Sequence, residues 1–131
     1  MEMRKIPIMV YNAIRQYNGG FSMKRIMTTE EWKNVLQLSS HTPCLVLKYS
    51  MTCFSSISAL KEFKALETIL PKYVVIVQKD REVSKMIEKE LEVRHESPQF
   101  LILQGGEGVW QATHYKIKQL LLSDAISMYV K

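Results

Sequence analysis

Two segments of this chain carry the residue types that thiol–disulfide exchange needs. Cys53 follows an apolar run at residues 44–49 and precedes a helical pattern, so we expect it at a strand-to-helix turn. A thiol there lies near the positive end of the helix dipole, which favours the reactive thiolate. Further along, Ser97 and Pro98 directly precede a second apolar stretch. Because proline cannot donate a backbone hydrogen bond, it is expected at the beginning of that strand. Together the two segments predict a redox site centred on Cys53.

A second sulfur is not available where dithiol chemistry would need it. The usual motif has a cysteine three residues after the first, and that position holds Ser56. The other cysteine, Cys44, lies at the far end of the same predicted strand, roughly 30 Å away along extended chain. We therefore expect Cys44 to be a small buried core residue and the exchange to use one thiol, or to borrow a second sulfur from outside. Thr52 and Ser56 could donate hydrogen bonds to the sulfur or to a substrate, although turn and helix-start structure accounts for them equally well.

Other roles for these residues remain open from the local sequence. The surroundings of Cys53 by themselves allow either a redox thiol or a passive buried one. Cys53, His95 and His114 could converge on a metal, but none has the paired short spacing of zinc sites, so no metal site is predicted. His95 could stabilise a thiolate near Pro98, whereas a loop histidine is more often solvated. His114 is expected to be structural.

The composition favours a single soluble domain. The chain has 131 residues and is 47% hydrophobic, enough for one core. Its net charge of +5 comes from dispersed basic residues, which is typical of a solvated surface and not of nucleic-acid binding. With only two cysteines, the chain is not a disulfide-stapled domain, so we expect a cytoplasmic location. No apolar run approaches the roughly 20 residues that cross a bilayer.

The hydrophobic periodicity predicts an α/β domain at residues 23–131, preceded by an N-terminal extension at residues 1–22. Thr28 or Thr29 can cap a first helix, and Thr28 and Glu31 have capping-box spacing. Strands are then expected at residues 44–49, 73–77, 99–104 and 109–113, with helices after Cys53, after Asp80 and from about Lys116. The order βαβαββα is the thioredoxin plan: a thioredoxin-like, four-stranded mixed sheet flanked by helices, with an extra N-terminal helix. In such folds the proline before the third strand is cis, which would turn the backbone of Ser97 toward the reactive sulfur.

Apolar residues recur along two of the predicted helices. The helix after Cys53 is expected to continue until Pro71, with Ile57, Leu60, Phe63, Leu66 and Leu70 at three- and four-residue steps. The last helix is expected to carry Ile117, Leu120, Leu121, Ala125, Ile126 and Tyr129.

Residues 48–53 paired with residues 93–99 resemble the monothiol bacilliredoxin family, general-stress-type proteins of thioredoxin fold in the bacillithiol redox system. The resemblance covers about residues 28–117, and its most specific part is His95-Glu96-Ser97-Pro98-Gln99. The family usually has Thr-Cys-Pro-Ile-Ser at the active turn, where this chain has Thr52-Cys53-Phe54-Ser55-Ser56. The nucleophile and the final serine match, but the proline and isoleucine do not. Losing the proline leaves a free amide at Phe54.

This resemblance implies a thiol–disulfide oxidoreductase that removes bacillithiol from S-bacillithiolated cytosolic proteins. Cys53 would be the catalytic nucleophile, and the substrate would contact Thr52, Ser56, His95, Ser97 and Pro98. Bacillithiol would be the low-molecular-weight thiol co-substrate with no bound cofactor, and the partners would be bacillithiolated clients, not nucleic acid or membrane. Because bacillithiol carries carboxylates, Lys48, Arg94 or His95 could supply positive charge, although the ordinary interpretation of each is a surface residue. The alternative is a non-catalytic thioredoxin-like adaptor or redox-sensing stress protein.

Overall fold

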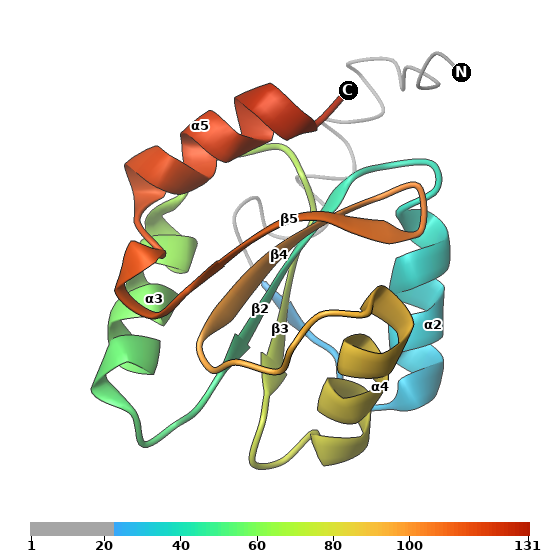
Figure 1. Ribbon diagram of the computed structural model, residues 1–131, viewed down its shortest axis with the longest axis horizontal. Helices are drawn as coiled ribbons and strands as arrows, with labels where there is room; N and C mark the ends of the chain where they lie inside the picture. Colours follow the sequence, from blue (N-terminus) through green and yellow to red (C-terminus); the bar gives the residue numbers. More distant parts are fainter. Residues whose placement is uncertain (1–22) are drawn as a thin grey trace.

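A five-stranded mixed sheet organises the part of the chain that the computed structural model describes, residues 23–131 (Figure 1). The predicted extension at residues 1–22 lies outside the described residues. The sheet has the order β1-β3-β2-β4-β5. Strands β1, β2 and β3 are parallel to one another, whereas β4 runs antiparallel to both β2 and β5. The strands are β1 (Lys24–Arg25), β2 (Cys44–Tyr49), β3 (Lys72–Ile76), β4 (Gln99–Gln104) and β5 (Glu107–Thr113).

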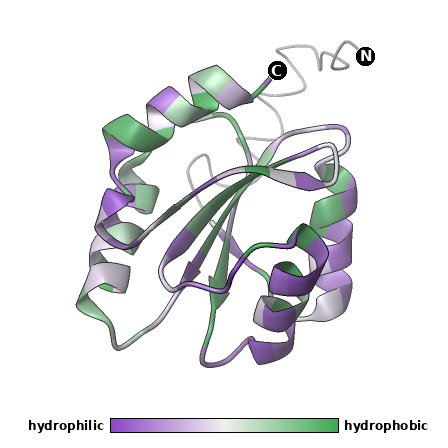
Figure 2. Ribbon diagram, in the orientation of Figure 1, coloured by the Kyte–Doolittle hydropathy of each residue, from purple (hydrophilic) through white to green (hydrophobic). Residues whose placement is uncertain are grey.

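Helices cover both faces of this sheet. One core cluster joins the sheet to α3 (Phe54–Ala65) and α5 (Gln119–Tyr129), and a second joins it to α2 (Thr29–Leu38) and α4 (Arg81–Leu91), as the two sides of Figure 1 show. The central strands are apolar while α4 is largely hydrophilic (Figure 2), because only its inner side, with Val83 and Ile87, is buried. The capping box at Thr28 is present. The predicted thioredoxin-like fold is therefore confirmed, and the helix expected before the strand at residues 44–49 is present as α2, although β1 precedes it.

The prediction of four strands missed β1. This strand has two residues, too few for an alternating pattern, and it exists because it pairs with β3. Its position is reinforced by Arg25, whose Nε and Nη2 donate to the carboxylate of Asp80 at 3.0 and 2.7 Å. Asp80 precedes α4, so this pair ties the sheet edge to that helix.

Helix α3 is shorter than predicted, ending at Ala65 instead of just before Pro71. The buried Lys72 explains the end: its Nζ donates to the carbonyl oxygen of Phe63 at 2.8 Å and to that of Leu66. The last carbonyls of a helix have no partner within it, and here a side chain from β3 satisfies them. Leu66 and Leu70 remain buried in the segment that follows, but Ile57 is 54% exposed and does not face the core.

The last helix also differs from its prediction. It begins at Gln119, after a 3-10 turn at His114–Lys116. Leu120 and Leu121 are exposed, and Leu122 is buried with Ala125. Three successive leucines leave the rotation of a helix undecided by periodicity, and the packing against α3 decides it.

Candidate functional site

Cys53 lies at the junction between the turn that follows β2 and the first residue of α3. It is the N-cap residue of that helix, is partly exposed, and is a free thiol. The first turn of α3 contains no acidic residue. A thiolate at this position therefore gains from the positive end of the helix dipole without a neighbouring negative charge from that turn.

Hydrogen bonds from the first turn of α3 lower the pKa of the Cys53 thiol. The main cause is the hydroxyl of Ser55, whose Oγ lies 3.0 Å from Sγ. The backbone N–H groups of Ser56 and Ser55 act in the same direction, and burial acts against them. Because the thiolate is the nucleophile in disulfide exchange, this arrangement prepares Cys53 for attack.

The turn that carries Cys53 is held by two side chains from outside it. The Oγ of Ser56 accepts the backbone N–H of Ser50 at 2.9 Å, and Ser56 is fully buried. Gln78, which follows β3, accepts the N–H of Met51 at 3.1 Å and donates to the Oγ of Ser50 at 2.6 Å. Thr52 is exposed on this turn, with its Oγ1 3.4 Å from Nε2 of Gln78. Thr52 is thus open to a substrate, whereas Ser56 supports the turn from inside.

Ser97 and Pro98 reach the same end of the sheet as Cys53. The peptide between them is cis, as the fold analogy predicts. Lys48 pairs with Gln99 in the antiparallel β2–β4 register, so the turn after β2 and the segment before β4 leave the sheet together. The carbonyl of Pro98 accepts the N–H of His114 at 3.1 Å. Within the described residues, the buried Oγ of Ser97 has no hydrogen-bond partner.

A buried lysine lies beneath the segment that precedes β4. Lys48 is fully buried, and its Nζ lies 2.7 Å from Nδ1 of His95 and 3.1 Å from Oε1 of Gln99. Burial lowers the pKa of Lys48 to about 8, against the opposing effect of nearby carboxylates, so the ammonium form still dominates at pH 7. An ammonium can only donate, so Nδ1 of His95 accepts and its ring proton is on Nε2. Burial, followed by the charge of Lys48, lowers the pKa of His95. At neutral pH, His95 is therefore an uncharged N–H donor.

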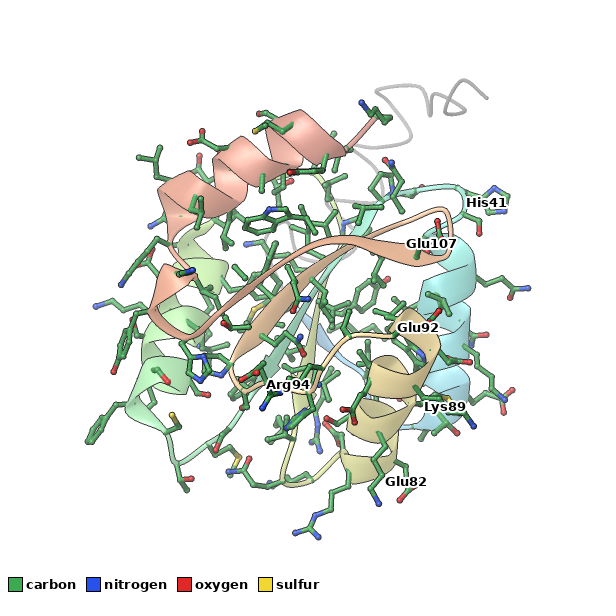
Figure 3. All side chains as sticks on the ribbon, viewed as in Figure 1. His41, Glu82, Lys89, Glu92, Arg94 and Glu107 are labelled. Atoms are coloured by element: carbon green, nitrogen blue, oxygen red, sulfur yellow. The ribbon has the colours of Figure 1, made fainter. Side chains whose placement is uncertain are left out.

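The remaining candidate residues have simpler surroundings. The side chain of Arg94 is 91% exposed and lies 3.6 Å from a carboxylate oxygen of Glu96. Figure 3 places Arg94 toward the end of the sheet where α4 begins, with His41 and Glu107 at the opposite end.

Within residues 23–131, no three His, Cys, Asp or Glu side chains gather as a metal site requires. In the same range, no helix has the length and apolar character needed to cross a membrane.

Cys44 is a passive core thiol, which confirms the interpretation from sequence. It is fully buried, and its Sγ donates to the carbonyl of Thr42 at 3.2 Å. Burial raises its pKa to about 12. Cys44 is therefore neither exposed nor ionised as a resolving cysteine would need to be.

Sequence reasoning missed three contributors to this site. Ser55, not Ser56, makes the closest side-chain contact with the sulfur. The support from Gln78 has no local signal, because it depends on how the ends of β2 and β3 meet. The buried position of Lys48, in contrast, has a local sequence signal. A lysine that interrupts an apolar run in a strand covered on both faces must be buried with partners.

Comparisons with known proteins agree with this geometry. The family model described as Monothiol bacilliredoxin BrxC matches residues 24–122, which include both Cys53 and Pro98. The chain is also similar to the solved structure of a proposed oxidoreductase with a thioredoxin fold, at 31% identity and a TM-score of 0.72 over 79% of this chain and 92% of that one.

More distant structures share the fold. The thioredoxin of Fasciola hepatica has 14% identity and a TM-score of 0.68, covering 82% of this chain and 99% of its own. The Malassezia sympodialis thioredoxin has 17% identity and a TM-score of 0.66, covering 82% and 90% respectively.

Proposed function

The chain belongs to the monothiol bacilliredoxin family, and from this premise we propose that it removes bacillithiol from S-bacillithiolated proteins through the thiolate of Cys53. A redox role in general terms already follows from the family and from the thioredoxin fold. The observation that carries the more specific proposal is the partly exposed Cys53 at the start of α3, with its pKa lowered chiefly by Ser55. A single ionisable sulfur is what a monothiol cycle requires.

The proposed cycle consists of two exchange steps. In the first, the Cys53 thiolate attacks the bacillithiol sulfur of the mixed disulfide, the sulfur–sulfur bond to the client breaks, and the client leaves as a thiolate that takes up a proton. Cys53 is then joined to bacillithiol. In the second, the thiolate of another bacillithiol, or of a reductase, attacks that bacillithiol sulfur and releases Cys53 as a thiolate. With bacillithiol as the reductant, the product is bacillithiol disulfide and the electrons balance.

The surrounding residues have distinct roles in this proposal. The backbone of Ser97, before the cis Pro98, would align the incoming disulfide with Cys53, and the exposed Thr52 would contact it from the turn. His95 would offer a hydrogen-bond donor. Bacillithiol is a co-substrate in this scheme, no bound cofactor takes part, and the clients are bacillithiolated proteins of a reducing cytoplasm.

The two cysteines of the chain provide a matched test. A test protein carrying bacillithiol on one cysteine is incubated with bacillithiol and each variant, and release of the client thiol is followed. We expect wild type and Cys44→Ala to turn over, and Cys53→Ser to have no activity. Wild type that releases no thiol from this substrate would overturn the proposal. If Cys53 takes up bacillithiol from bacillithiol disulfide, releasing one bacillithiol thiolate, but frees no client thiol from the test protein, the redox-sensing alternative is indicated instead.

A further inference from the structure

A cleft of about 400 Å³ lies next to the turn that carries Cys53, between the first turns of α4 and the segment that precedes β4. This volume is within the range of small-molecule sites. The cleft borders the active turn through Gln78, whose side chain bonds both Ser50 and Met51. Its polar lining consists of Gln78, Arg81, Ser84, Lys85, Glu88 and His95.

The lining of this cleft has a surplus of positive charge. Arg81 and Lys85 contribute two cations, and Glu88 contributes one carboxylate. One oxygen of Glu88 is engaged by the backbone N–H of His95 at 3.2 Å. The Nζ of Lys85 lies 3.8 Å from Oε1 of Glu82. Both side chains are more than 70% exposed, and ion pairs at exposed sites are weak. The Nε of Arg81 donates to the carbonyl of Gln78 at a long 3.4 Å. A small anion in the cleft would therefore lie near two cations whose existing partners are weak.

The interior behind the cleft adds to this preference. The buried ammonium of Lys48 occupies Nδ1 of His95, which leaves Nε2–H as the remaining polar group of a ring that lines the cleft. The ring is thus a donor and not an acceptor, and a third positive charge, that of Lys48, lies behind it. Ser84 Oγ, 3.4 Å from the same Nδ1, contributes a hydroxyl to the same wall.

We propose that this cleft binds the carboxylate-bearing part of the low-molecular-weight thiol in the mixed disulfide, with Arg81 and Lys85 as its anchoring cations. The inference rests on the proposed function and deepens it, because it assigns a specificity site to the same exchange reaction. Arginine binds carboxylates through paired N–H donors, and the two cations lie on one face of α4, one turn apart. The cleft then selects thiols with carboxylates over uncharged thiols.

Two disulfides that differ in charge test this assignment. One test protein is prepared as its mixed disulfide with bacillithiol and, separately, with uncharged 2-mercaptoethanol. We expect the double variant Arg81→Gln/Lys85→Gln to raise KM for the bacillithiol disulfide about tenfold relative to KM for the mercaptoethanol disulfide, with kcat little changed. The control Lys33→Gln/Lys89→Gln removes two exposed lysines outside the cleft and should leave this ratio at the wild-type value.

Binding without exchange separates this inference from the proposed function. S-methyl bacillithiol cannot form a disulfide, and its binding is followed by the backbone amide NMR shifts of residues 77–96. We expect shifts around the cleft in wild type and about tenfold weaker binding in the double variant. Equal binding by both, or an unchanged KM ratio, overturns the cleft assignment even if wild type is active. Wild type that is inactive on both disulfides refutes the function, and the NMR titration then decides the cleft alone.

Discussion

The buried ammonium of Lys48 makes a quantitative prediction about how the stability of this protein depends on pH. Burial lowers the pKa of Lys48 from 10.5 to about 8 in the folded protein. Between about pH 8 and pH 10.5, Lys48 holds its proton in the unfolded chain but loses it in the native state. The free energy of unfolding therefore rises with pH across this range. The full effect corresponds to about 3 kcal/mol, of which about 2 kcal/mol appears between roughly pH 7 and pH 9.5.

Lys48→Met isolates this contribution. The change removes the titrating group and keeps an unbranched side chain in the same place. Other groups also alter the alkaline stability, since the pKa values of Cys44 and Tyr73 are each raised to about 12 and that of Lys72 is lowered to about 8. The useful quantity is therefore the free energy of unfolding of wild type minus that of the variant. Urea unfolding measures it at pH 7 and at pH 9.5. We expect this difference to move by about 2 kcal/mol in favour of wild type at the higher pH.

The matched control is Lys89→Met, which removes an exposed lysine from α4. NMR titration provides a second readout, because loss of the charge of Lys48 should raise the pKa of His95. A difference between wild type and Lys48→Met that stays constant from pH 7 to pH 9.5 would refute the reasoning. It would mean that the ammonium is not desolvated as the structure indicates.

Three further predictions concern the site and its scaffold. Ser55→Ala should raise the pKa of the Cys53 thiol, because the hydroxyl 3.0 Å from Sγ is lost; the pH dependence of alkylation by iodoacetamide measures this. Phe54→Pro restores the residue usual in the family at the first position of α3, where the amide has no partner within the helix and the side chain is 83% exposed. We expect the free energy of unfolding to stay the same or to rise by up to about 1 kcal/mol in urea unfolding. Asp80→Asn should lower it by about 1–3 kcal/mol, because a carboxylate that accepts from Arg25 and Ile76 is lost. Burial opposes these bonds, but the pKa of Asp80 is lowered overall, so its contribution is present above about pH 4 and is lost as the pH falls through the folded pKa.

Each of these predictions has its own control. Ser58→Ala, on the same helix, should leave the thiol pKa unchanged, and an equal shift in both serine variants would argue against the assigned hydrogen bond. Ile57→Pro, inside α3, should cost about 3 kcal/mol or more, and a similar cost for Phe54→Pro would contradict its placement at the helix start. Asp124→Asn removes an exposed carboxylate from α5. If it destabilises as much as Asp80→Asn, the ion pair with Arg25 is not the cause.

The cis peptide before Pro98 shows what kind of information an expectation from sequence contains. Only about 5–6% of the peptide bonds that precede proline are cis in folded proteins, so the Ser97-Pro98 dipeptide alone favours trans. The expectation came from the order of elements and the place of the proline before a strand, and the structure agrees. The expectation that Ser56 hydrogen-bonds the sulfur agrees with the lowered pKa of Cys53, but the hydroxyl of the neighbouring Ser55 has the larger effect on this pKa. The Ser56 Oγ also accepts the N–H of Ser50 inside the turn, which its sequence position does not indicate.

The sequence by itself determined the features that depend on neighbours along the chain. A capping box began α2 at Thr28, an apolar run bounded β2 at residues 44–49, and the change of period after it placed Cys53 at the start of a helix. These features are local because helix capping, strand alternation and the helix dipole each act within a few residues.

Only the tertiary structure decided the features that join distant segments. The end of α3 depends on Lys72 reaching its last carbonyls, and the shape of the active turn depends on Gln78 at the end of another strand. The proton on His95 is placed by Lys48, 47 residues earlier. Hydrogen bonds and buried charges act over a few ångströms in space regardless of separation along the chain, so a linear pattern cannot name their partners.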